Sequence, residues 1–588
     1  MRFLSNVLAT IVGLLLFTVI AFFIFIGFIG IVASSEDKVN IKDNTLLHIN
    51  LENKLLVERA LEDPLAIPSI GPFSSVPSVG LNELKTAIRT AKDNENIKGI
   101  YLQTGVMLGG GPALLLELRD ELEAFKESGK FIVSYGELFT EGGYFLSSVA
   151  DEVYLNPMGA LEFNGLSSTS IFFTNLFKKL EVEPVIFRVG EFKSAVEPFM
   201  LEKMSEENRL QTAVFLNDLN DFALQKISAN RNIELARLKE INDQMLVRKN
   251  QDALDLKLVD GLWYSDQVGD LLREKLGMKE DEDIRTVNVT NINKTAETKN
   301  RSSKNRIAVI VAEGEIVSGD SEGAIGSRKF ANELRKARKD KDIKAIVLRV
   351  NSPGGSVLAS EVIWREMAEA KKEKPVIASM SELAASGGYY ISAPADTIVA
   401  QPNTITGSIG IFGLWFNMQG LLNNKLGITT DEVGTGEYSD FMNPTRSISP
   451  AEKQIVQNQV EDGYDTFLQR VADGRNMTKE QVMEVASGRV WSGLQAKENG
   501  LVDILGGLDD AVRIAAEKAG VADDYRVLYY PEQKTFIERF LSEFSRDVQS
   551  RYMKFKLGSD QYFLYQQLER IKKYDGLMVR LPFDIEIR

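Results

Sequence analysis

The alternation of apolar and polar positions predicts that this chain is built from βα units. Short apolar runs such as Ile346–Val350 have the length and the β-branched content of buried strands. Longer stretches such as Ser360–Lys372 repeat apolar residues at the spacing of one helix face. Because strands and helices alternate in this way through most of the sequence, we expect the α/β fold class.

The same motifs occur twice along the chain, which predicts an internal duplication. The matching pairs are Asn82–Lys85 with Asn332–Arg335, Asn96–Leu102 with Asp342–Leu348, Glu137–Phe145 with Glu382–Tyr390, Asn156-Pro157 with Gln401-Pro402, Gly190–Lys193 with Gly436–Ser439, and Leu258–Gly261 with Leu501–Ile504. The offset within a pair stays between about 243 and 250 residues, and such a steady offset indicates a repeat. The two halves are therefore expected to share one fold.

The first part of the chain is predicted to anchor it in a membrane. No charged residue lies within 7–33, and this run of mainly Leu, Ile, Val and Phe is long enough to cross a bilayer. A cleaved signal peptide has a shorter apolar region that ends in a small-x-small site, so we expect an uncleaved transmembrane helix in contact with the lipid bilayer. Arg2 precedes the segment and Glu36 and Asp37 follow it, which favours a cytoplasmic N-terminus and an exported body.

Shifts in composition divide the chain into five expected segments. These are a membrane anchor at 1–38, a first repeat at 39–289, a linker at 290–305 rich in Asn, Lys, Thr and Ser, a second repeat at 306–530, and a C-terminal tail at 531–588. The tail contains a charged, aromatic stretch with helical spacing, 533–550, and ends in 577–588, which alternates like a strand. It has no counterpart in the first half, and the sequence assigns it no role.

Charge and composition exclude several kinds of partner, nucleophile and metal site. The net charge of -14 argues against a nucleic-acid partner. The chain has no Cys, which excludes thiolate nucleophiles, and its single His, His48, excludes a His-rich metal centre. We therefore expect no metal and no cofactor. His48 lies in a predicted strand, Leu46–Asn50, so a Ser-His-Asp triad is the least favoured arrangement.

The strongest candidate for chemistry is a serine at a predicted strand-to-helix turn. Ser386 comes after the apolar run Pro375–Met380 and directly before Gly387 and Gly388, which open a segment with helical spacing. A hydroxyl at such a turn can act as a nucleophile, and the N–H of Gly387 at the helix start can bind a developing negative charge. The alternative interpretation is a glycine turn that only begins a helix.

Comparison of the two halves adds a possible base. The second half has Ser386 where the first has Glu141, and the first half has Lys193 where the second has Ser439. Each half would then supply one member of a Ser/Lys pair. The amine of such a pair must be neutral, which requires burial or a cationic neighbour to lower the lysine pKa from about 10.4. Lys193 lies among apolar residues in Phe192–Val196, although a solvated loop lysine remains the alternative.

Two further loops provide polar groups for the same site. The segment Asn351–Ser356 follows a strand, and the N–H of Gly355 would form one side of an oxyanion hole with Gly387 on the other. The alternative interpretation of this segment is a tight βα turn. In Thr406–Gly410, the Ser408 hydroxyl would hydrogen-bond the lysine amine and orient it.

The residues after the third loop are apolar and have two possible roles. They are Ile409, Ile411, Phe412, Leu414 and Trp415. They either line an open groove that takes apolar peptides next to Ser386, or they belong to the ordinary core.

Together with the duplication and the anchor, four motifs resemble those of the signal peptide peptidase A family of serine peptidases in its long, duplicated form. The motifs are Asn351–Ser356, Ala385–Tyr389, Thr406–Gly410 and Gly190–Ala195. The resemblance runs roughly from the anchor to residue 530. It implies two tandem repeats of a Clp protease/crotonase-like domain, with Ser386 as nucleophile and Lys193 as general base.

The resemblance also implies where such a protein works and on what. It implies a homotetramer in the inner membrane, with its catalytic body on the periplasmic side. The implied substrates are cleaved signal peptides and other apolar, unstructured peptides.

Two other functions stay open from the residues alone. A crotonase-like acyl-CoA enzyme uses the same βα units and glycine loops to hold a thioester enolate, but the division of Ser386 and Lys193 between the halves would then have no purpose. A non-catalytic membrane scaffold would use the anchor and the charged tail to recruit partners.

Overall fold

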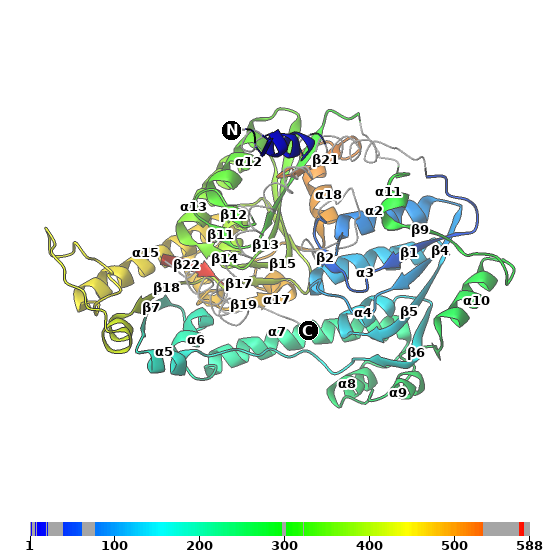
Figure 1. Cartoon of the computed structure of the whole chain (residues 1–588), viewed down its shortest axis with the longest axis horizontal. Helices are drawn as coiled ribbons and strands as arrows, with labels where there is room; N and C mark the ends of the chain where they lie inside the picture. Colours follow the sequence, from blue (N-terminus) through cyan, green and yellow to red (C-terminus); the bar gives the residue numbers. More distant parts are fainter. Residues whose placement is uncertain are drawn as a thin grey trace.

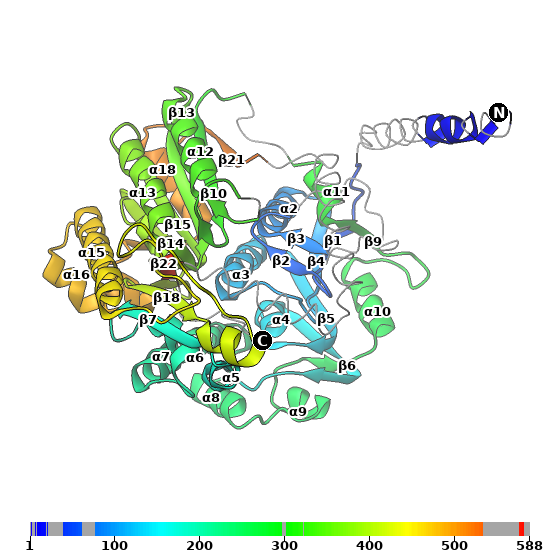
Figure 2. The ribbon, with the colours of Figure 1, turned by 60° about the vertical axis from the view of Figure 1, so that its left-hand side comes forward.

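Two α/β units lie side by side in this protein, each with a sheet covered by helices (Figure 1, Figure 2). The first sheet is parallel throughout, and the second is parallel except for its edge strand β19 (Val490–Ser492). The computed structural model describes residues 2, 6–7, 9–18, 20, 39–60, 77–296, 302–321, 323–532 and 576–580. The α/β fold class and the duplication predicted from the motifs are confirmed within these residues.

The first unit has a six-stranded, fully parallel sheet. Its order is β8 (Gly261–Leu262), β6 (Glu152–Leu161), β5 (Phe131–Phe139), β4 (Ile97–Gln103), β1 (Thr45–Asn50) and β9 (Arg285–Asn288). A separate pair is formed by β2 (Leu55–Val57) and β3 (Ser78–Gly80). The helices of this half are α2 (Leu81–Asp93), α3 (Pro112–Lys126), α4 (Glu141–Ser147), α5 (Thr174–Leu180), α6 (Glu197–Met200), α7 (Glu206–Arg231), α8 (Leu235–Asp243), α9 (Asn250–Asp255), α10 (Ser265–Lys275) and α11 (Val289–Asn293), with a 3₁₀ turn, η1 (Ser194–Val196).

The second unit repeats this plan. Its sheet order is β19 (Val490–Ser492), β17 (Ile405–Gly407), β15 (Val376–Ala385), β13 (Ile343–Ser352), β10 (Arg306–Glu313) and β21 (Arg526–Tyr530), while β16 (Thr397–Ala400) pairs with β15 and with β20 (Ile504–Leu505). The helices are α12 (Ser327–Lys339), α13 (Val357–Lys371), α14 (Gly387–Ser392), α15 (Pro450–Arg475), α16 (Lys479–Val485), α17 (Gly493–Glu498) and α18 (Leu508–Lys518), with a π-helix, η2 (Leu421–Leu426). The paired sequence motifs fall on equivalent elements, since α2 corresponds to α12, β4 to β13 and α4 to α14.

A third sheet joins the two halves and the tail. Its order is β12 (Ile325–Gly326), β11 (Ile316–Val317), β14 (Gly354–Ser356), β22 (Gly576–Arg580), β18 (Ile411–Asn417) and β7 (Glu183–Val189). The first half supplies β7, which pairs antiparallel with β18 of the second half along its whole length. The strand-like pattern predicted for the end of the tail is confirmed at 576–580, whereas the helix predicted at 533–550 lies outside the described residues.

The predicted anchor is only partly covered by the structure. Residues 9–18 are helical, and 21–38 lie outside the described residues. Within the described part of the chain, no helix combines the length and the apolar character needed to span a membrane. The predicted linker at 290–305 begins later than expected, because α11 extends the first half to Asn293 and packs against α2.

A buried cluster of charges fastens the halves together. The Arg349 guanidinium donates to both carboxylate oxygens of Glu58, at 2.9 and 3.1 Å, and to Glu117 at 2.6 Å. Glu117 also accepts a hydrogen bond from Lys85 at 2.9 Å. Burial opposes ionisation of Glu117, but Arg349 and Lys85 outweigh it and lower its pKa to about 2. Arg349 belongs to the second half and its partners to the first, so the cluster fixes their relative position.

Loss of Arg349 is expected to destabilise the protein strongly. The Arg349→Met variant leaves Glu58 buried without the guanidinium that pairs with it and leaves Glu117 with Lys85 alone. Breaking a buried ion pair in this way costs roughly 3–5 kcal/mol. Arg513→Met is the matched control, because Arg513 pairs with Asp510 and Glu517 on the surface, where an ion pair contributes less than about 1 kcal/mol. Urea unfolding followed by tryptophan fluorescence measures both. Equal midpoints for the two variants would contradict the role given to the cluster.

Candidate active site

Ser386 occupies a strained turn between a strand and a helix. It follows the last residue of β15 and precedes the first residue of α14, as the sequence predicts. Its backbone has φ 55° and ψ -110°, a region that residues other than glycine rarely adopt. The turn is held on both sides, since the Ser386 N–H donates to the Gly407 carbonyl at 2.7 Å and its own carbonyl accepts from the Tyr390 N–H at 2.8 Å. Such a turn projects the hydroxyl away from the helix it begins.

Lys193 reaches this hydroxyl from the other half of the chain. It lies in the turn between β7 and η1, and its Nζ is 2.9 Å from Ser386 Oγ. The same nitrogen is 2.9 Å from Ser408 Oγ and donates to the Ser408 carbonyl at 3.2 Å. All three residues are fully buried. The structure therefore brings together the three side chains predicted from separate motifs, and Lys193 is not a solvated loop lysine.

The surroundings of the Lys193 amine favour its neutral form. Burial lowers the pKa of Lys193 well below its usual value. The oxygens that contact it belong to hydroxyl and carbonyl groups, so these contacts provide no negative charge to hold an ammonium ion. A neutral amine has two N–H donors and one lone pair. This set of groups matches the site. The two N–H donors can bind the hydroxyl and carbonyl oxygens of Ser408 while the lone pair faces the Ser386 hydroxyl.

A glycine that the sequence analysis did not single out gives Lys193 its position. Gly488 has φ 78°, and a Cβ atom built on it would lie 2.7 Å from the backbone nitrogen of Lys193. Its N–H donates to the Ile409 carbonyl at 2.8 Å, and the preceding Ser487 carbonyl accepts from the Phe192 N–H at 3.0 Å. The segment around Gly488 thus packs directly against the lysine turn. Position 488 has room only for the hydrogen of a glycine.

Gln211 on α7 is the second residue that sequence reasoning missed. Its side-chain amide donates to the Phe192 carbonyl at 3.2 Å and to Ser194 Oγ at 2.9 Å, on either side of the lysine. Its carbonyl oxygen accepts from the Val490 N–H of β19 at 3.2 Å. One buried amide therefore ties the lysine turn of the first half to the sheet of the second. No local pattern distinguishes such a residue from other polar positions of a long helix.

The two predicted oxyanion donors lie on elements that pack against each other. Gly387 is the first residue of α14, so its N–H has no acceptor within the helix. Gly355 lies in β14, which packs on α14. The end of β13 also lies close to α14, because a Cβ on Gly388 would lie 2.8 Å from the carbonyl oxygen of Ser352, the last residue of β13. Stabilisation of an oxyanion by these groups stays a prediction.

The apolar run after Ser408 does not line an open groove. Ile409, Ile411, Phe412 and Leu414 are buried and only Trp415 is partly exposed, which favours the alternative that they are core. Phe412 and Leu414 pack in one cluster with Met578 of the tail strand β22. The sequence predicts a strand in the tail but could not show that it covers this run, because the two segments lie far apart along the chain.

Two residues of the first half, Glu141 and His48, have structural contacts and do not belong to the cluster around Ser386. Glu141, in the place of the serine, is half-buried at the start of α4 and accepts hydrogen bonds from the Asn164 and Gly165 N–H groups, each at 2.7 Å. His48 lies in β1 of the first sheet, with its Nε2 atom 2.8 Å from Gln103 Oε1. It has no part in the cluster around Ser386.

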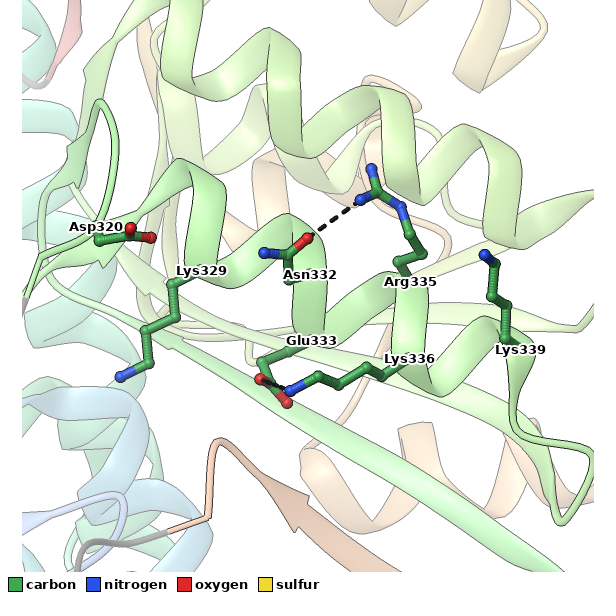
Figure 3. A pocket seen from close by; sticks show the side chains of 7 residues that line it. All are labelled: Asp320, Lys329, Asn332, Glu333, Arg335, Lys336 and Lys339. Carbon is green, nitrogen blue, oxygen red and sulfur yellow. Dashed lines mark hydrogen bonds and ion pairs between the residues drawn. The ribbon is translucent and has the colours of Figure 1, made fainter.

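A hollow on the outer face of α12 is a separate feature. Its lining side chains are polar: Asp320, Lys329, Asn332, Glu333, Arg335, Lys336 and Lys339 (Figure 3). They form local contacts such as the ion pair of Lys336 with Glu333 at 2.9 Å. None of the predicted site residues lies among them.

Comparisons with known proteins place both halves of the site in one family. The profile of Peptidase family S49 matches residues 124–279 and 368–522, so that Lys193 lies in the first matched stretch and Ser386 in the second. Protease 4 of Salmonella typhi is 38% identical over 480 residues, which cover 80% of this chain and 77% of that protein. Protease 4 of Haemophilus influenzae is 36% identical over 494 residues, or 80% of this chain and 78% of its own. A chloroplastic serine protease SPPA of Arabidopsis thaliana is 32% identical over 455 residues, or 76% and 66%.

Substitution of Gly488 is expected to displace the lysine. Gly488→Ala places a methyl group against the Lys193 backbone, and a shift of about 1 Å at a reactive group costs on the order of a hundredfold in rate. Gly520→Ala is the matched control, because Gly520 also has a positive φ, 67°, but a Cβ there meets nothing within 4 Å. The rate at which a fluorophosphonate labels Ser386, followed by mass spectrometry, compares the two. Equal rates would show that Gly488 does not position Lys193.

Proposed function

Because the chain belongs to Peptidase family S49 and is a serine peptidase, we propose that Ser386 is its nucleophile and Lys193 its general base. The observation that carries this proposal is the buried contact of 2.9 Å between Lys193 Nζ and Ser386 Oγ. An activated nucleophile needs a base within hydrogen-bond reach, and the base needs a group that orients it. Ser408 is that orienting group in the proposal, through its hydroxyl and its carbonyl oxygen.

The reaction follows from the protonation state of the amine. Neutral Lys193 accepts the hydroxyl proton as Ser386 Oγ attacks the carbonyl carbon of a peptide bond. The resulting ammonium then gives this proton to the leaving amine, which separates as the acyl-enzyme forms. A water molecule, deprotonated by the same lysine, then attacks the acyl carbon. The bond to Ser386 Oγ breaks, the ammonium returns its proton to this oxygen, and the second product leaves with a carboxyl group.

Backbone donors complete the proposed site. The tetrahedral intermediate carries a negative oxygen, and the N–H groups of Gly387 and Gly355 are the proposed donors to it. The start of a helix adds a favourable field at Gly387. The dyad lies out of water, where such donors act more strongly than in solution.

The proposal extends to the fold type, the assembly and the location. We assign both α/β repeats to the Clp protease/crotonase type and the assembly to a homotetramer. The uncharged run at 7–33 supports a membrane anchor in the inner membrane, with the body on the periplasmic side. Peptides available there include cleaved signal peptides and other apolar, unstructured segments, which are the proposed substrates.

The two rival functions account for fewer observations. A crotonase-like acyl-CoA enzyme needs an acid or base aimed at a thioester, and Asn351–Ser356 contains no carboxylate. A non-catalytic scaffold does not explain why the buried amine of Lys193 contacts Ser386, whose backbone is strained. Membership of a peptidase family is in line with neither.

Removal of the nucleophile tests the proposal. Ser386→Ala is expected to abolish hydrolysis of an unstructured apolar peptide while the fold is retained, because the covalent step has no other nucleophile. Ser392→Ala is the control, since Ser392 is also a buried serine at α14, where its hydroxyl donates to the Gly388 carbonyl at 2.8 Å. Turnover by Ser386→Ala above about a thousandth of the wild-type rate would refute the assignment.

A further inference from the structure

The tail strand β22 fills a slot that leads to the dyad. It lies between β14 and β18 and pairs antiparallel with both. It is the short red strand labelled β22 in Figure 1 and Figure 2. The other edge of β14 is paired with β11, and that of β18 with β7. Without β22, the backbone groups of β14 and β18 that face this strand slot would lack strand partners.

The register of β22 directs it at the catalytic groups. Met578 pairs with Phe412 on β18, and Arg580 pairs with Gly354 on β14. If the pairing with β18 is continued towards its start, Arg580 comes opposite Gly410. A Cβ on Gly410 would lie 3.2 Å from Cδ of Lys193. The strand therefore approaches the dyad along its own axis, in the way an extended peptide must approach a nucleophile.

The side chains of β22 are held as those of a bound peptide would be. Met578 is 3% exposed and packs in an apolar pocket with Phe177, Phe199 and Phe412. Phe177 and Phe199 belong to the half that supplies Lys193, and Phe412 to the half that supplies Ser386. Arg580 forms an ion pair with Glu315 at 3.2 Å, in which both side chains are mostly buried. The slot thus offers one apolar pocket and one acidic contact, spaced two residues apart.

The state of the nucleophile agrees with an occupied site. Ser386 has no exposed surface, so a peptide has to take the place of something before its carbonyl carbon reaches Oγ. Extended peptides commonly bind by adding a strand to a sheet, with backbone hydrogen bonds giving affinity and alternate side chains giving specificity. The strand slot has both of these features.

We propose that β22 is a built-in pseudosubstrate, which occupies the peptide-binding slot and competes with substrates for it. This inference rests on the proposed function, because it takes Ser386 and Lys193 as the catalytic pair. It deepens that function in two ways. Exchange of β22 sets the fraction of enzyme open to peptides, and the pocket around Met578 selects an apolar side chain in the substrate. Apparent affinity for a peptide falls in proportion to the open fraction.

Expulsion of the strand tests the proposal. Met578→Asp in the full chain places a charge in the apolar pocket and is expected to speed fluorophosphonate labelling of Ser386, and to lower KM for an apolar peptide, by at least about tenfold. Met158→Asp is the matched control, because Met158 is 87% exposed, and it should behave as wild type. A labelling rate of Met578→Asp equal to or below wild type would overturn the proposal.

A second measurement keeps the test decisive if Met578→Asp does not fold. A chain that ends at Lys573 lacks β22, and a synthetic peptide of residues 574–582 should inhibit its labelling competitively. The same peptide with Asp in place of Met578 should not. Equal inhibition by both peptides, or by neither, would overturn the proposal. Labelling that never falls on Ser386 in any of these proteins would instead refute the proposed nucleophile, and this separates the two failures.

Discussion

The site depends on the contact between the desolvated amine of Lys193 and the hydroxyl of Ser386, whose backbone is strained. Lys193 is buried among uncharged groups, so the protein must hold its amine without a carboxylate and still within 2.9 Å of Ser386. Each supporting feature meets this requirement. Gly488 allows the lysine turn to approach, Gln211 ties that turn to β19, and Ser408 takes up the N–H donors. These groups come from both halves, so the site exists only when the halves are docked.

Duplication explains how such a site can be divided. Both halves have the same strand-turn-helix element, but Glu141 replaces the serine in the first half and holds a neighbouring loop there. The first half instead sends β7 into the third sheet, and Lys193 follows directly after this strand. The Arg349 cluster then fixes the docking. In the proposed mechanism, one copy of the fold therefore supplies the nucleophile, and the other supplies the base together with part of the apolar pocket.

The sequence predicted the parts of this arrangement that depend on local chemistry. Ser386, Lys193 and Ser408 could be found because each lies in a short motif, and comparison of the halves showed which copy had kept which group. Gly488 and Gln211 could not be found, because their importance lies in contacts with residues far along the chain. For the same reason the apolar run at Phe412 was open to two interpretations. This run pairs with β22, which lies in the tail beyond the end of the second repeat. Strand pairing between segments so far apart leaves no local signal in the sequence.

The protonation state of Lys193 tests the central claim most directly. Lysine labelled with nitrogen-15 allows the Nζ resonance of Lys193 to be followed by NMR through a pH titration, with the signal assigned by its absence in Lys193→Arg. The account predicts that the amine loses its proton well below the ordinary lysine pKa of about 10.4, and that Ser386 becomes more reactive as pH rises over the same range. A Lys193 that stays protonated up to about pH 10.4 would contradict the account.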